Sequence, residues 1–129
     1  MSVSIDRIDH VVFTVRDISA TCEFYAQVLG MEAREFGGRM ALHFGRQKIN
    51  LHRAGHEFEP KAANPGPGTA DLCFITEQPI EDVIATLEQE GVAIELGPVA
   101  KEGALGAMTS VYFRDPDDNL IEVARYSAA

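Results

Sequence analysis

The sequence has no apolar run near the roughly 18 residues that a membrane-spanning helix needs, and no basic-then-apolar signal at its N-terminus. Basic residues are also few: 11 Lys and Arg stand against 20 Asp and Glu, which gives a net charge of -9. Because a phosphate-binding face needs a basic patch, this balance argues against nucleic acid and anionic membranes as partners. We therefore expect a cytoplasmic protein that does not act on a membrane.

Cysteine is scarce as well, and its two positions, Cys22 and Cys73, form no C-x-x-C motif. Both lie in apolar segments, which predicts buried free thiols in a reducing compartment. What is present is an ordinary globular composition, with 46% hydrophobic and 24% charged residues. A chain of 129 residues is long enough for one domain with a hydrophobic core.

The two halves of the chain repeat one order of predicted elements, β-α-β-β-β. The first half predicts a strand, a helix and three strands, at 10–15, 17–30, 31–36, 40–44 and 48–52. The second half predicts the same series, at 71–76, 79–91, 92–96, 108–113 and 120–124. This pattern indicates an internal duplication in an α+β fold.

The repeat sets the expected organisation of a single domain over residues 1–129. Module one covers about residues 5–53 and module two about residues 70–127, with a linker rich in Gly and Pro at about 54–69. A second segment with Gly and Pro, 97–107, predicts a flexible loop that could act as a lid.

The last predicted hairpin contains the most distinctive motif. Its turn, Asp115 to Asn119, combines Pro with short acidic and amide side chains that bond their own backbone. One charge, Glu122, interrupts the apolar strand that follows. A carboxylate at that position must face solvent, find a partner or hold a metal.

Strand alternation predicts which side chains share a face with that carboxylate. In each module the apolar set of residues packs on the helix, and the other face carries His10, Asp71 and Glu122. These three metal-competent side chains would converge if the two sheets curl around a common cavity.

The chain resembles the vicinal oxygen chelate superfamily, which includes glyoxalase I, fosfomycin- and bleomycin-resistance proteins and extradiol dioxygenases. The resemblance spans nearly the whole chain and is carried by the segments at 8–11, 23–31, 113–117 and 119–123. Segments like 48–52 and 57–61 make it most similar to small stand-alone glyoxalase-domain or virulence-associated proteins. The resemblance implies two tandem βαβββ modules with curled mixed sheets around a cavity, and a homodimer.

Position by position, the resemblance implies metal ligands at His10, Asp71 and Glu122, although the family usually has histidine where this chain has Asp71. Glyoxalase I also needs a glutamate where this chain has Asn50, which disfavours its two-carboxylate proton transfer. His52 lies two residues further on the same face and could supply a base or a fourth ligand.

One imidazole and two carboxylates suit a divalent metal, Mn, Fe, Ni, Zn or Mg. The leading hypothesis is a metal-dependent enzyme, a glyoxalase-type lyase or isomerase or an extradiol-type dioxygenase, acting on a small-molecule substrate with adjacent oxygens. Glu122 and His52 would be its catalytic residues. The alternatives are metal-free sequestration of a ligand, as in bleomycin-resistance proteins, and a structural or regulatory protein with a vestigial site.

Overall fold

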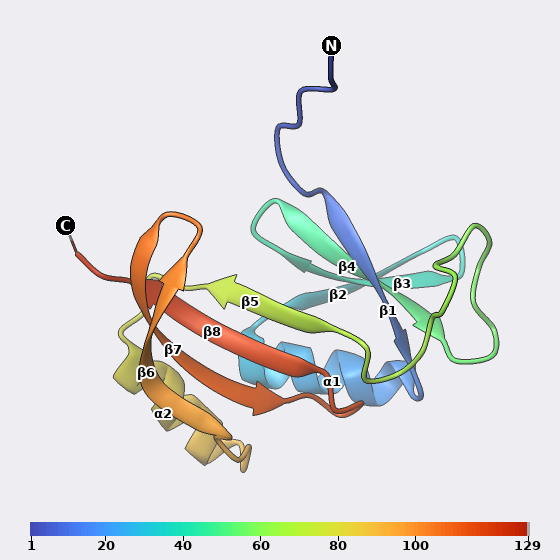
Figure 1. The fold of residues 1–129 in the computed structure, drawn as a ribbon. Helices are drawn as coiled ribbons and strands as arrows, with labels where there is room; N and C mark the ends of the chain where they lie inside the picture. The colour runs from blue at the N-terminus through green and yellow to red at the C-terminus, as the bar shows by residue number, and fades with distance from the viewer. Residues whose placement is uncertain (129) are drawn as a thin grey trace. The chain divides into compact units, whose positions relative to one another are not determined.

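The computed structural model describes residues 1–128, and the chain divides into two compact units, Met1–Gly66 and Pro67–Ala129. Each unit has one four-stranded mixed sheet and one helix in the order β-α-β-β-β (Figure 1). The α+β class and the tandem modules predicted above are therefore confirmed. A common cavity remains a prediction.

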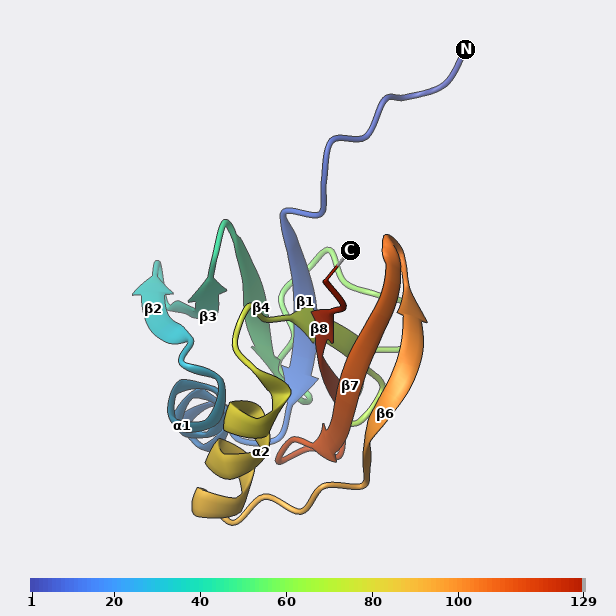
Figure 2. The same cartoon turned by 90° about the vertical axis from the view of Figure 1, so that its left-hand side faces the viewer.

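The first unit contains β1 (His10–Val15), α1 (Ile18–Leu29), β2 (Glu32–Phe36), β3 (Arg39–Phe44) and β4 (Gln47–Arg53). Its strands lie in the order β1-β4-β3-β2, which Figure 2 shows. The β1–β4 pair is parallel and the other pairs are antiparallel.

The second unit contains β5 (Asp71–Ile75), α2 (Ile80–Gln89), β6 (Leu96–Gly103), β7 (Gly106–Arg114) and β8 (Leu120–Tyr126). The order β5-β8-β7-β6 repeats that of the first unit, again with the first and last strands parallel. Among the described residues, no helix is long and apolar enough to cross a membrane.

The helix ends follow from local chemistry. The Asp17 carboxylate accepts a hydrogen bond from the Ala20 N–H at 3.1 Å, which caps the start of α1. At the other end, Gly30 adopts a φ of 65°, a left-handed conformation that suits glycine. In each unit the helix covers one face of its own sheet, where Leu42 and Val111 are fully buried.

The register confirms the duplication residue by residue. Phe13 of β1 lies opposite Leu51 of β4, and Phe74 of β5 lies opposite Val123 of β8. Asn50 in the first sheet therefore corresponds to Glu122 in the second.

Two expectations were wrong. Residues 92–95 are not a strand, and residues 97–107 are not a loop, because β6 and β7 form a long hairpin through this segment (Figure 2). The glycine and proline residues in it instead mark an irregularity in register between Leu96 and Val99. Gly97 has a φ of 117°, which places its backbone against the Ser110 carbonyl.

The turn between β7 and β8 is built on one buried carboxylate. Asp115 Oδ1 accepts hydrogen bonds from the N–H groups of Asp117 and Asn119, at 2.9 and 3.0 Å. The Asn119 amide then accepts a bond from the Ala70 N–H at 3.0 Å, which ties the start of β5 to this turn. The turn chemistry predicted from the sequence is confirmed, and it fixes where β8 begins.

Candidate functional site

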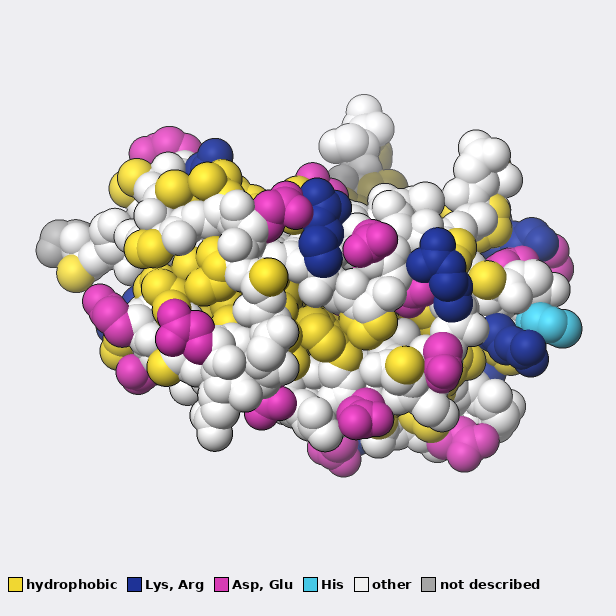
Figure 3. Space-filling model, turned by 90° about the horizontal axis from the view of Figure 1, so that it is seen from below, with side chains coloured by type: hydrophobic (Ala, Val, Ile, Leu, Met, Phe, Trp, Pro, Cys, Tyr) yellow, Lys and Arg dark blue, Asp and Glu magenta, His cyan; other side chains and the backbone are white. Residues whose placement is uncertain are grey.

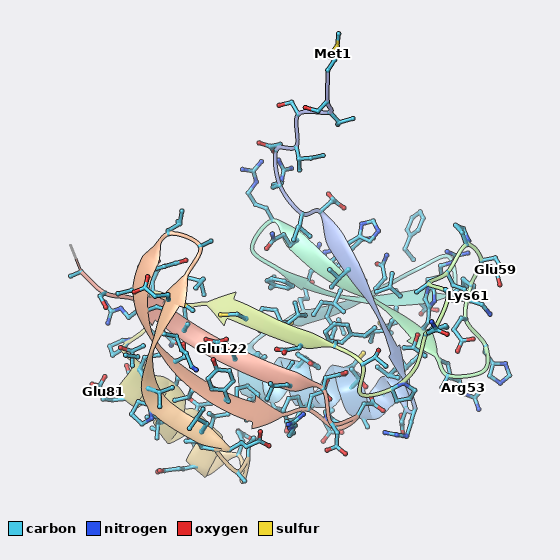
Figure 4. The ribbon with its side chains drawn as sticks, viewed as in Figure 1. Met1, Arg53, Glu59, Lys61, Glu81 and Glu122 are labelled. Atoms are coloured by element: carbon cyan, nitrogen blue, oxygen red, sulfur yellow. The ribbon has the colours of Figure 1, made fainter. Side chains whose placement is uncertain are left out.

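The central feature of the second unit is a row of three polar side chains across its sheet. Glu122 of β8 lies between Cys73 of β5 and Tyr112 of β7 in the strand register. Its neighbours in sequence, Ile121 and Val123, are buried on the opposite face, so the row lies on the face away from α2. Figure 4 labels Glu122 where it projects from β8.

Glu122 perturbs both neighbours. Burial, together with the charge of Glu122 and hydrogen bonding to it, raises the pKa of the Cys73 thiol to about 11. The same causes raise the pKa of Tyr112, with smaller contributions from Cys73 and Asp71. Both neighbours are therefore protonated at neutral pH and can donate a proton or a hydrogen bond.

One oxygen of this carboxylate has no partner. Glu122 Oε2 is buried and makes no hydrogen bond within the described part of the chain. An unsatisfied buried carboxylate oxygen is unfavourable in a folded protein. Such an atom can accept a cation or a proton donor on a ligand.

Asp71 is the first residue of β5 and is exposed. It lies two residues from Cys73 on the same strand, so it shares the face of Glu122. Cys73 is exposed too, because β5 is at the edge of its sheet. Cys22 is only partly buried, so the expectation of two buried thiols was wrong at both positions.

His10 is the first residue of β1 in the other unit. Its Nδ1 lies 2.9 Å from Asp9 Oδ2, and 45% of the side chain is exposed. The hydrogen bond to His10 is the main cause that lowers the pKa of Asp9. A carboxylate can only accept, so Nδ1 is the donor in this contact, and Nε2 is the ring nitrogen that Asp9 does not engage. A histidine that binds a metal is commonly oriented in this way.

His52 is held differently. It is 8% exposed, and its ring is T-shaped to the Phe58 ring, with centroids 5.3 Å apart. The guanidinium of Arg39 stacks on the same Phe58 ring, with Cζ 4.0 Å from the ring centroid. Burial, and then the charge of Arg39, lower the pKa of His52, while Glu57 opposes the shift. His52 is therefore neutral at pH 7.

Arg39 and Phe58 were not among the site residues inferred from the sequence. Phe58 lies in the linker, and only its apolar character in a polar segment hints that it packs on a strand. Arg39 shares a face with His52 by strand alternation, which is a weak signal on its own.

The predicted metal ligands are divided between the units. His10 belongs to the first unit, and Asp71 and Glu122 belong to the second. Across the described residues, no three His, Cys, Asp or Glu side chains form a group that could hold a metal ion. The three-ligand site thus remains a prediction.

Known proteins share both the sequence and the fold. Virulence protein STM3117 from Salmonella typhimurium is 58% identical over 95% of this chain and 85% of its own length. Glyoxalase domain-containing protein RDO1 from Mycosarcoma maydis is 48% identical over 98% of this chain and 72% of its own. The integron cassette protein VCH_CASS1 of V. cholerae superposes with a TM-score of 0.96, at 57% identity, over 98% of this chain and all of that one.

More distant structures share the fold alone. A lactoylglutathione lyase from Agrobacterium tumefaciens is 22% identical, with a TM-score of 0.72 over 95% of both chains. TnmS3, an antibiotic binding protein from Streptomyces, is 21% identical, with a TM-score of 0.75 over 98% of this chain and all of that one.

The family model that matches is described as the Glyoxalase/Bleomycin resistance protein/Dioxygenase superfamily, and it covers residues 7–123. That span takes in both modules and reaches from the first strand to the last. The chain belongs to the Glyoxalase/Bleomycin resistance protein/Dioxygenase superfamily.

Proposed function

We propose that this protein is a metal-dependent enzyme of glyoxalase or dioxygenase type, acting on a small molecule with two adjacent oxygens. His10, Asp71 and Glu122 would hold the metal. The observation that carries the proposal is the buried, unpartnered Oε2 of Glu122, in a row where both neighbouring side chains are perturbed by the carboxylate.

The donor set fits a divalent ion. His10 offers Nε2 because Asp9 binds its other nitrogen, and two carboxylates supply hard oxygen ligands. Mn²⁺, Fe²⁺, Ni²⁺, Zn²⁺ and Mg²⁺ all suit one nitrogen and two oxygens. When bound, such an ion acts as a Lewis acid and stabilises negative charge on a chelated substrate oxygen.

The chain's own residues would handle protons and orientation. Tyr112 is protonated beside Glu122 and can donate a hydrogen bond to a substrate oxygen as charge develops there. The neutral imidazole of His52 can accept a proton, which is the role predicted from the sequence. Asn50 cannot exchange a proton as a carboxylate does, so we do not assign the glutathione-dependent glyoxalase I reaction.

Metal-free sequestration of a ligand is the second candidate. It is favoured by the contact of Arg39 and His52 with Phe58, which could hold an organic ligand without a metal. The antibiotic-binding neighbour TnmS3 shares the fold, although at 21% identity it carries no more than that.

Metal content distinguishes the two candidates. We expect tag-free protein, loaded with each candidate ion and desalted, to retain close to one ion per chain, and His10→Ala or Glu122→Ala to lose it. His43→Ala and Glu102→Ala are matched controls, because they remove an imidazole and a carboxylate outside the proposed ligand set. Atomic emission measures the metal, and circular dichroism checks the fold. Retention of metal at wild-type affinity by His10→Ala or Glu122→Ala would refute the assignment.

A further inference from the structure

We propose that Arg39 and His52, seated against Phe58, form a subsite that binds an anionic group of the ligand, a carboxylate or a phosphate. The inference rests on the proposed function, because it narrows the substrate to a molecule with adjacent oxygens at one end and a negative charge at the other. It concerns residues of the first unit alone.

Charge is divided unevenly along the chain. Residues 1–66 hold eight of the eleven Lys and Arg residues and all four histidines, against eight acids. Residues 67–129 hold three Lys and Arg residues against twelve acids, so the whole net charge of -9 comes from the second unit. In Figure 3 the visible Lys and Arg side chains gather mainly in one half of the face, while Asp and Glu occur across it. The first unit therefore has no net negative charge to repel an anion, whereas the second unit has.

Arg39 has the geometry of such a site. Its guanidinium stacks on the Phe58 ring, with Cζ 4.0 Å from the centroid. Within the described residues it makes no ion pair with a carboxylate, unlike Arg34, which binds Glu32 at 2.9 Å, and Arg114, which binds Glu95 at 3.0 Å. A stacked guanidinium keeps its in-plane N–H donors free, and these match a carboxylate or phosphate edge.

His52 lies in the same contact. The residue is 8% exposed, its ring packs against the Phe58 ring, and the charge of Arg39 acts on it. Its ring nitrogens are not among the buried, unpartnered polar atoms of the described residues, so they stay accessible to a ligand. As a neutral ring it has one N–H to donate.

The nearest carboxylate is engaged elsewhere. Glu57 acts on His52 through its charge, but its oxygens lie 2.7 Å from the Gly55 N–H and 3.7 Å from Lys61 Nζ. Lys61 also contacts Glu59 at 3.4 Å, and both are labelled on the linker in Figure 4. Both linker carboxylates therefore have partners other than Arg39, and the Arg39 guanidinium is left for an external anion.

The strand register gives the scale of the ligand. Thr14 lies beside His52, and His10 is four residues earlier on β1. At about 3.3 Å per residue, the two positions are roughly 13 Å apart along the sheet. A substrate that reaches both positions would be an elongated small molecule rather than a single-carbon oxyanion, and His52 would then exchange a proton at its anionic end rather than at the metal-bound oxygens.

Anion binding can be measured on metal-free protein, so that its result is independent of the metal site. ¹⁵N-labelled protein is titrated with succinate, inorganic phosphate and uncharged succinamide at constant ionic strength. We expect saturable shifts of amide signals around Arg39 and His52 with at least one anion and not with succinamide. Arg39→Gln should weaken the binding at least about tenfold, which is the loss of one charge-assisted bidentate contact. The better-bound anion then identifies carboxylate or phosphate as the group recognised.

Arg46→Gln is the control, because Arg46 is an exposed cation in the turn between β3 and β4. It should change the affinity by less than about twofold if the site is specific. Equal weakening in both variants, equal binding of succinamide, or no saturable shift in wild type would each overturn the proposal. A failed metal assay with intact anion binding would instead count against the metal site alone.

Discussion

At the scale of single residues, Glu122 and His52 are both polar groups in sparsely polar surroundings, but they are held in different ways. Glu122 has two protonatable neighbours in its own sheet and one free oxygen. His52 has an aromatic neighbour and a nearby cation. Glu122 is thus suited to bind a cation or a proton, and His52 to act as a neutral donor or acceptor.

Sequence alternation placed Glu122, Asp71 and Cys73 on one face, and the register agrees. It could not show that Arg39 stacks on Phe58, because that contact joins a strand to an irregular linker and has no periodic signal. Nor could it show that Cys73 is exposed, because edge position depends on strand order.

The buried state of His52 predicts a pH dependence of stability. Its folded pKa lies below the ordinary value of about 6.5, so the unfolded chain binds the proton first as the pH falls. The free energy of unfolding should therefore fall from about pH 6.5 down to the folded pKa, and the contribution of His52 should be constant below that. Urea unfolding of wild type and His52→Gln across this range measures the effect.

The stability difference between wild type and His52→Gln should change with pH, while His56→Gln controls for loss of an exposed loop histidine. A difference that is constant with pH would contradict the shifted pKa of His52. The charged groups acting on this ring are Arg39 of β3 and Glu57 of the linker, and they act in opposite directions.

At the scale of elements, the β6–β7 hairpin is the one that the sequence patterns predicted wrongly, as a loop. Gly97, Pro98, Gly103 and Gly106 are typical of a loop, yet they lie within or at the ends of two paired strands. Sequence patterns could not separate a loop from a strand with an irregular register, because both need the same residue types. The turn at Asp115 was predictable, because its bonds are local.

A glycine substitution tests this account of the hairpin. A Cβ at Gly97 would lie 2.6 Å from the Ser110 carbonyl oxygen, whereas one at Gly106 would meet nothing within 4 Å. Both residues have positive φ, which strains any residue with a Cβ. Gly106→Ala therefore measures the cost of this backbone strain alone, a loss of about 1 kcal/mol in the free energy of unfolding. Gly97→Ala should lower the free energy of unfolding by about 2 kcal/mol more, from overpacking. Equal losses in urea denaturation would show that the close approach is not maintained.

At the scale of the whole molecule, the repeat of two βαβββ units was predictable from the sequence. Each unit repeats the same hydrophobic pattern, with turn residues such as glycine and proline between its elements. The division of charge follows from composition once the boundary between the units is known. Substrate identity was not readable, because the Arg39 subsite is built from side-chain contacts.

The resemblance also predicts a homodimer, which sedimentation should show as twice the chain mass. Mixing His10→Ala with Glu122→Ala then tests where the ligands come from. If each site takes His10 from one subunit and Glu122 from the other, random exchange restores about a quarter of the sites, because half of the dimers are mixed and each has one intact site. If each site lies within one chain, the mixture binds no metal. A monomeric mass would refute the predicted dimer.

The strand order has a consequence for how the protein is made. In each unit the last strand synthesised, β4 or β8, is an inner strand that pairs with the first strand on one side and the third on the other. Neither sheet can be completed while its final strand is still inside the ribosome. In the second unit, β5 and β7 therefore keep unpaired edges until β8 emerges and pairs with both. The same strand carries Glu122. Nascent chains that stop short of β8 would lack both a joined sheet and this carboxylate, and exposed edges would mark them for removal by cellular quality control.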